Sequence, residues 1–152
     1  MSKKQRQGFT LIEIMIVIAI IAILASAVLI GLGSTQKAGR DSRRISDLRQ
    51  VQTALELYHN DKATYPIETT WAAMANDLMT DTNISVGTIP NDPNPGATYY
   101  YTNVAGGQDY VIGAQLETGS QVFNGYVVPT LPDGWPAGVT CTQAALQYCI
   151  TL

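Results

Sequence analysis

Hydrophobic and polar positions divide the chain into two parts. The 24 residues between Phe9 and Leu32 contain a single charged side chain, Glu13. As a helix this segment would be about 36 Å long, at about 1.5 Å per residue, enough to cross the apolar core of a bilayer of about 30 Å. We therefore expect residues 9–33 to form a hydrophobic transmembrane helix.

Beyond this segment the pattern becomes amphipathic. Apolar residues recur at steps of three and four, which is typical of one face of a helix, and they are Ile45, Leu48, Val51, Leu55 and Tyr58. The pattern predicts that the other faces are filled by charged residues, namely Arg43, Arg44, Asp47, Arg49 and Glu56. Residues 34–65 should therefore continue the helix and pack against a folded domain.

The ends and weak points of this long helix also follow from the sequence. We expect one helix from about Phe9 to Asp61, because a residue that precedes proline, here Tyr65 before Pro66, is pushed out of the helical region. Gly31 and Gly33 weaken the helix by about 1 kcal/mol each relative to alanine. Whether the helix is continuous at these two glycines stays open.

The sequence of residues 66–152 predicts a small domain in which one short helix precedes a sheet. The helix is expected at Thr70–Met79, with Thr69 or Thr70 as its N-cap. Ile89–Gly96 reads as turns, and three strands are expected at Thr98–Val104, Tyr110–Leu116 and Val122–Val128. The tail Pro129–Leu152 is expected to be irregular. This order of elements predicts an α+β fold, a long N-terminal helix packed on a small antiparallel sheet.

Charge is distributed unevenly along the chain. The net charge is −3, yet residues 1–8 hold Lys3, Lys4 and Arg6 and no acid. A basic end before an apolar segment places the N-terminus in the cytoplasm and the remaining chain outside. The remaining chain is acidic, and this argues against nucleic acid as the partner of a monomer. If the C-terminus is outside the cytoplasm, a disulfide between Cys141 and Cys149 is favoured, two unpaired packed thiols being the alternative.

A short motif links the basic N-terminus to the apolar segment. The string Gly8-Phe9-Thr10-Leu11-Ile12-Glu13 resembles the processing signal of type IV prepilins and of type II secretion pseudopilins, in residue types and in spacing. The resemblance implies that a prepilin peptidase cuts between Gly8 and Phe9, removes residues 1–8 as a leader peptide, and methylates the new amino group of Phe9.

The resemblance also implies how such a chain assembles. Glu13 would pair with the free amine of Phe9 in a neighbouring subunit, because a carboxylate in a lipid-embedded helix costs about 2.5–3.5 kcal/mol and needs a partner. The apolar helices would bundle into the core of a helical homo-oligomeric filament, with residues 66–152 displayed as a pilin head. The implied partners are the peptidase, an inner-membrane assembly platform and, before assembly, the membrane itself.

Three functions are compatible with these features. The first is a pilin of an extracellular type IV pilus-like filament, since Cys141 and Cys149 resemble the C-terminal disulfide loop of type IV pilins. The second is a major pseudopilin of a type II secretion system, to which the segment from Ile89 to Tyr101 is similar. The third, from another class, is a monomeric membrane-anchored binding domain, which would not be processed at Gly8.

Residues for catalysis are not found in the sequence, and we expect neither an enzyme nor a cofactor. His59 is the sole histidine and is expected to be solvated or half-packed on the helix. Asn91, Asp92 and Asn94 offer oxygen ligands, and major pseudopilins bind calcium near their sheet. Their spacing matches no EF-hand, and turn formation explains them without a metal, so they remain calcium candidates only.

Overall fold

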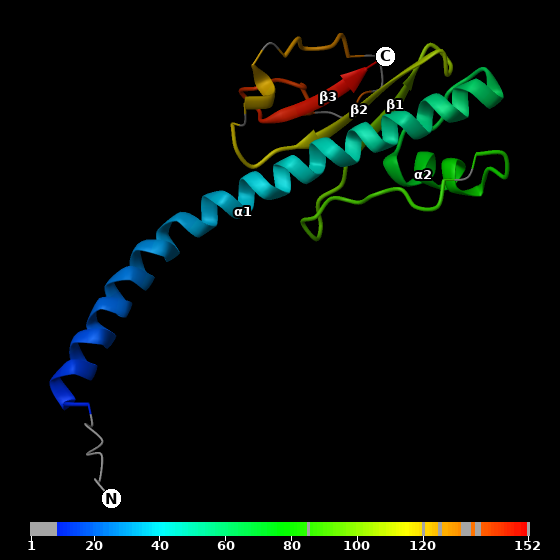
Figure 1. Ribbon diagram of the computed structural model, residues 1–152. Helices are drawn as coiled ribbons and strands as arrows, with labels where there is room; N and C mark the ends of the chain where they lie inside the picture. The colour runs from blue at the N-terminus through cyan, green and yellow to red at the C-terminus, as the bar shows by residue number, and fades with distance from the viewer. Residues whose placement is uncertain are drawn as a thin grey trace, which may run out of the picture. The chain divides into compact units, whose positions relative to one another are not determined.

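The computed structural model describes residues 9–84, 86–119, 121–124, 126–131, 135 and 138–151. The backbone of residues 27–32 and 121 is included in these ranges, but their side chains are not described. The elements labelled in Figure 1 are α1 (Leu11–Lys62), α2 (Trp71–Thr80), β1 (Tyr100–Val104), β2 (Asp109–Gln115) and β3 (Gln147–Thr151). A short 3-10 helix, η1 (Gln121–Phe123), lies between β2 and β3 in the sequence. The predicted α+β class is confirmed.

The chain forms two compact units, an N-terminal unit (Met1–Gln36) and a unit that we call the head (Lys37–Leu152). In the N-terminal unit, α1 begins at Leu11, and large apolar side chains are exposed along it as far as Leu24. Among the described residues, no helix is both long and apolar enough to cross a membrane.

The head is built on the second half of α1, which lies along the sheet (Figure 1). Of the apolar side chains expected on one helix face, Leu48, Val51 and Leu55 are fully buried, and Ile45 and Tyr58 are partly buried and pack against the same core. They form one core cluster with residues of the second helix and of all three strands, including Met74, Tyr101, Ile112 and Tyr148. Burial of this amphipathic face is what holds α1 to the head.

The sheet has three antiparallel strands in the order β1-β2-β3. Ile112 in the central strand pairs with Tyr101 on one side and with Ile150 on the other. Side chains alternate between two faces: Ile112 lies in the main core, while its neighbour Val111 lies in a second cluster with Cys141 and Cys149.

The prediction of a third strand at Val122–Val128 is wrong. Residues 121–123 form η1, residues 126–131 belong to no helix or strand, and Val127 is 82% exposed. Pro129, which lacks a backbone N–H, follows directly and disfavours a ladder at this point. The Tyr126 hydroxyl instead contacts the backbone of Cys149, donating to its carbonyl oxygen (3.3 Å) and accepting from its N–H (3.0 Å).

The third strand is found in the tail that was predicted to be irregular. Gln147–Thr151 pairs with β2 over five residues. Its position depends on Gly113 in β2, because a Cβ atom there would lie 2.8 Å from the Cys149 sulfur and 3.3 Å from the Tyr148 carbonyl oxygen. A glycine in the central strand therefore makes room for the disulfide beside β3.

The helix ends agree with the sequence to within one or two residues. Helix α1 runs without a break through positions 31 and 33 and ends at Lys62. Ala63 follows in the left-handed region (φ 58°), and its N–H donates to the His59 carbonyl oxygen at 2.7 Å. The second helix begins after its predicted cap, because the Thr70 side chain accepts a hydrogen bond from the Ala73 N–H at 3.4 Å.

Candidate functional site

Two of the residues predicted to direct processing and assembly lie at the start of α1, Phe9 just before the helix and Glu13 in its first turn. Phe9 is the first described residue and is 84% exposed, whereas Gly8 and the predicted leader 1–8 lie outside the described residues. Thr10 donates twice to Glu13 Oε2, from its N–H at 2.8 Å and from its hydroxyl at 2.7 Å. The Glu13 N–H in turn donates to the Thr10 hydroxyl at 3.4 Å.

This reciprocal pattern is a capping box, which satisfies amide groups that a helix start would otherwise leave unpaired. It fixes the start of α1 two residues after Phe9 and holds one carboxylate oxygen of Glu13 against its own helix. Glu13 Oε1 accepts no hydrogen bond from another described residue, so it is available to a group from outside the chain. Sequence analysis identified Glu13 but missed its contact with Thr10.

The first part of α1, together with the residues just before it, exposes a long apolar surface. We call it the apolar segment (residues 9–24). Monomeric soluble proteins rarely expose contiguous apolar patches of more than a few hundred Å², and larger patches mark interaction surfaces. The side chains that are at least half exposed are Phe9, Leu11, Ile12, Ile14, Met15, Ile16, Val17, Ile18, Ile20, Ile21, Ile23 and Leu24.

A buried cluster of charges lies where α1 enters the head, and we call it the Arg44 cluster (Arg40, Asp41, Arg44, Asp92 and Glu117). Arg44 is 2% exposed. Its Nε and Nη2 donate to the two oxygens of Asp92 at 2.7 and 2.9 Å. Its Nη1 donates to Asp41 Oδ1 at 2.9 Å and to Glu117 Oε1 at 2.8 Å. One guanidinium therefore connects α1, the segment before β1 and the segment after β2.

Two further members complete the cluster. Arg40 Nε donates to Glu117 Oε1 at 2.7 Å, and its Nη2 donates to the other oxygen. Asp41 accepts from the N–H groups of Glu117 and Thr118, each at 2.9 Å, and from the Thr118 hydroxyl at 2.7 Å. Hydrogen bonds from Arg40, and then from Arg44, lower the pKa of Glu117 to about 2. The Asp92 carboxylate is the main cause that raises the pKa of Arg44.

The prediction that Arg44 and Asp47 lie on outward faces of the helix is therefore wrong, since both are buried. Arg44 stands four residues before Leu48, in the same row of the helix as the core residues, and this spacing could have indicated its burial. Arg43 fits the prediction, because its side chain is 63% exposed and lies 3.7 Å from Asp47.

Carboxylates of α1 also accept hydrogen bonds from buried tyrosines. The Tyr99 hydroxyl donates to Asp47 Oδ2 at 2.7 Å. Those of Tyr65 and Tyr110 donate to the two oxygens of Glu56, each at 3.1 Å. Burial, with Glu56 as a further cause, raises the pKa of Tyr65 to about 12. These tyrosines stay protonated at physiological pH. Tyr110 ties β2 to the helix, and Tyr65 and Tyr99 tie to it the segments after α1 and before β1.

His59 and the cysteines take the structural positions expected of them. The ring of His59 is half-buried and stacks on that of Tyr65, with centroids 4.5 Å apart. Cys141 and Cys149 form the predicted disulfide, with Cα atoms 5.5 Å apart. The disulfide joins β3 to the segment before it and lies on the sheet face away from the main core.

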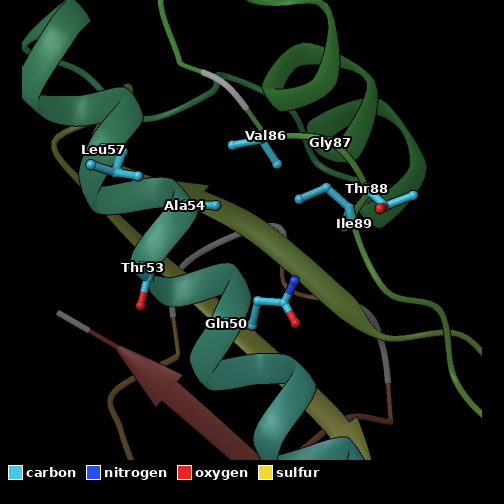
Figure 2. Close-up of a pocket in the computed structure, with 8 residues that line it drawn as sticks. All are labelled: Gln50, Thr53, Ala54, Leu57, Val86, Gly87, Thr88 and Ile89. Atoms are coloured by element: carbon cyan, nitrogen blue, oxygen red, sulfur yellow. The ribbon is translucent and has the colours of Figure 1, made fainter.

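An open groove of about 420 Å³ lies between α1 and the segment at residues 86–89. Figure 2 shows Ile89 directed towards the helix, on which Ala54 and Gln50 lie. The lining contains apolar, amide and hydroxyl side chains and no titratable group, so it offers no acid or base for catalysis. The lining residues are Gln50, Thr53, Ala54, Leu57, Val86, Gly87, Thr88 and Ile89.

The residues of the predicted calcium loop do not fit a calcium site. Both oxygens of Asp92 accept hydrogen bonds from Arg44, and one of them also accepts from the Asn94 N–H at 2.8 Å, a typical turn contact. Asn91 is exposed and adds no carboxylate. Within the described part of the chain, no group of three or more histidine, cysteine, aspartate or glutamate side chains is arranged to hold a metal.

Comparison with known proteins identifies the N-terminal motif. Residues 3–29 match the family model of the prokaryotic N-terminal methylation motif. The chain is also similar to proteins named type II secretion system core protein G. It is 38% identical to that of Aeromonas hydrophila over 66 residues, which cover 43% of this chain and 46% of the relative.

Other relatives of the same name give similar values. The chain is 44% identical to the protein of Klebsiella pneumoniae over 64 residues (41% of this chain, 45% of the relative). It is 43% identical to that of Escherichia coli K12 over 63 residues (41% of this chain, 43% of the relative). The chain thus matches less than half of the length of these relatives, and no solved structure matches it. The motif and the relatives confirm the predicted relation to the type IV pilin superfamily.

Proposed function

We propose that this chain is the structural subunit of a type IV pilus-like filament, processed at its N-terminus and assembled through its first helix. The observation that carries the proposal is the methylation motif at residues 3–29, which contains the whole of the exposed apolar segment. An exposed surface of that size requires a partner, and copies of the same helix offer one of matching character. The proposal includes no catalytic step.

Processing is the first step of the proposed function. A prepilin peptidase removes residues 1–8 and methylates the amino group of Phe9. The high exposure of Phe9 and the helix start at Leu11 support this step, because the bond to be cut then precedes the helix instead of lying inside it. Gly8 and Phe9 stay predictions as cleavage and methylation sites.

Assembly is the second step. Glu13 has one oxygen held by Thr10, and we propose that the other accepts the Phe9 amine of the next subunit. Such a pair orients the incoming subunit and sets its axial position, because a charge–charge hydrogen bond is short and directional. The remaining apolar side chains then pack in the core of the filament and leave the heads outside.

The proposed location follows from these steps. The precursor is anchored at the inner or cytoplasmic membrane with residues 1–8 in the cytoplasm, where it meets the peptidase and an assembly platform. The assembled filament is extracellular.

A second candidate function is the major pseudopilin of a type II secretion system, which forms a periplasmic filament. It is supported by the printed name of the relatives, type II secretion system core protein G. The Cys141–Cys149 loop instead resembles that of type IV pili. The two functions share processing and assembly, and they differ in whether long surface filaments are made. Electron micrographs of wild-type and deletion cells, with an assay of secreted enzymes, distinguish them.

The test of the shared steps is intact mass spectrometry of the protein purified from its own cells. The expected mature chain begins at Phe9, with a single methyl group on its amine. A Gly8→Val variant should accumulate as unprocessed precursor. A mature protein that still carries Lys3 and Lys4 would contradict the proposal and favour a monomeric membrane-anchored binding domain.

A further inference from the structure

The Arg44 cluster brings carboxylates from three separate segments to one point. Asp41 lies on α1, Asp92 precedes β1, and Glu117 follows β2, yet each has an oxygen within 2.9 Å of the Arg44 guanidinium. The side chains of Asp41 and Asp92 are 1% exposed. Oxygen atoms that converge from several segments can surround a calcium ion, but with Arg44 between them these carboxylates are not arranged to hold a metal.

We infer that Arg44 is a built-in cation that replaces a divalent metal in this head, so that the three segments are held together without calcium. The inference concerns folding of the head, so it does not rest on the proposed filament.

The hydrogen bonds carry the argument. Four donor contacts of Arg44 engage the three carboxylates, two of them as a bidentate pair to Asp92. A planar guanidinium matches a carboxylate in this geometry and is always charged, which a lysine ammonium does not reproduce. Calcium requires oxygen ligands at about 2.3–2.6 Å, and with Arg44 in place the Asp92 oxygens already face a positive group.

Charge balance leads to the same conclusion. The cluster contains two arginines and three acids, so it carries one net negative charge with Arg44 and two without it. A buried carboxylate that loses its cation strongly destabilises the folded state, because its charge is then uncompensated. Removal of Arg44 therefore leaves a space lined by Asp41, Asp92 and Glu117, the ligand type that calcium prefers. Loss of the arginine should create a dependence on calcium that the wild-type head lacks.

The test measures thermal unfolding of the full chain in detergent. Intrinsic fluorescence of Trp71 and Trp135 reports the head, since both residues lie within Lys37–Leu152. The wild-type protein is melted in a calcium chelator and in about 5 mM calcium chloride. We expect the two Tm values to agree within about 1 °C. A rise of several degrees in calcium would overturn the inference, and this comparison needs no variant to fold.

The variants test the role of Arg44 itself. Arg44→Ala should lower the Tm in chelator by at least about 10 °C. Addition of about 5 mM calcium chloride should then raise its Tm by about 5 °C. The matched control is Arg43→Ala, one residue away and exposed, which should change the Tm by no more than about 2 °C and give no response to calcium.

Milder variants cover the case in which Arg44→Ala does not fold. Arg44→Lys keeps the charge and loses the bidentate contact, and Asp92→Asn keeps the shape and removes one carboxylate. Both should melt below the wild type, and neither should gain stability from calcium, because the first retains a cation and the second loses a charged ligand. An Arg44→Ala protein that melts like the wild type, or one that folds but is insensitive to calcium, would show that Arg44 does not act as the cation of the head.

Discussion

Loss of the Cys141–Cys149 disulfide is expected to weaken the attachment of β3 to the head. Within the part of the chain that the structure describes, this strand has a neighbour on one side only, β2, with which it pairs over five residues. Besides this ladder, the Tyr126 hydroxyl contacts the Cys149 backbone, and the disulfide ties the strand to Cys141. Reduction breaks the covalent cross-link between β3 and Cys141 and leaves the hydrogen bonds in place.

The magnitude follows from the length of the closed loop. The two cysteines are eight positions apart, and the chain-entropy relation for a loop of about nine residues gives about 2.6 kcal/mol at 25 °C. Both cysteines are buried, so serine in their place would add the cost of burying a hydroxyl without a partner, about 1–3 kcal/mol. The double variant Cys141→Ala/Cys149→Ala avoids that cost and also avoids a free thiol.

The assay is urea unfolding of the full chain in detergent, followed by tryptophan fluorescence. Oxidised wild type, wild type in reductant and the double alanine variant are compared. The last two should both lose about 2–4 kcal/mol of unfolding free energy relative to the first. Reductant added to the double variant is the control and should change nothing. Equal stability of the oxidised and reduced wild type would refute the reasoning, as would two thiols that alkylate freely without reductant.

The remaining predictions concern assembly, helix termination and pH. Glu13→Ala should be cleaved normally but absent from a sheared-surface fraction, with Glu13→Asp partly defective; wild-type amounts of filament from Glu13→Ala would show that the carboxylate is not needed. Ala63→Gly should raise the unfolding free energy by about 1 kcal/mol in urea, because the residue lies at φ 58°, where a Cβ is unfavourable; a loss of stability would contradict this. Because the folded-state pKa of Glu117 is lowered from 4.5 to about 2, its stabilisation is present above pH 4.5 and lost as the pH falls towards 2. Glu117→Gln should therefore flatten the decline of Tm in that range, and an unchanged decline would be the contrary result.

The elements that rest on periodicity were predictable from the sequence. Helix α1 follows from its apolar run and its amphipathic continuation, and α2 from its threonine cap and apolar face. The strand β2 was predicted because its apolar residues are framed by turn signals. In each case the pattern that forms the element is local, so no knowledge of distant contacts was required.

The failures arise where distant contacts decide the structure. Val122–Val128 has strand-forming residues, but Tyr126 contacts β3 through its side chain and Pro129 disfavours continued pairing. Strand β3 has only five residues, and it is placed by the disulfide and by the space left at Gly113. The burial of Arg44 could be read from its spacing to Leu48, but its partners Asp92 and Glu117 could not, because they are 48 and 73 positions away in the sequence. Pairing over such distances leaves no periodic signal.

The two halves of α1 have separate roles in the proposed function, and this separation makes the proposals independently testable. The first half exposes apolar side chains behind the Thr10–Glu13 cap, so substitutions there should affect assembly and leave the head folded. The second half buries Leu48 and the Arg44 cluster, so substitutions there should lower the stability of the head first. A Glu13→Ala protein with a wild-type melting curve and an Arg44→Ala protein that is still cleaved after Gly8 would together show that one continuous helix serves two functions that do not depend on each other.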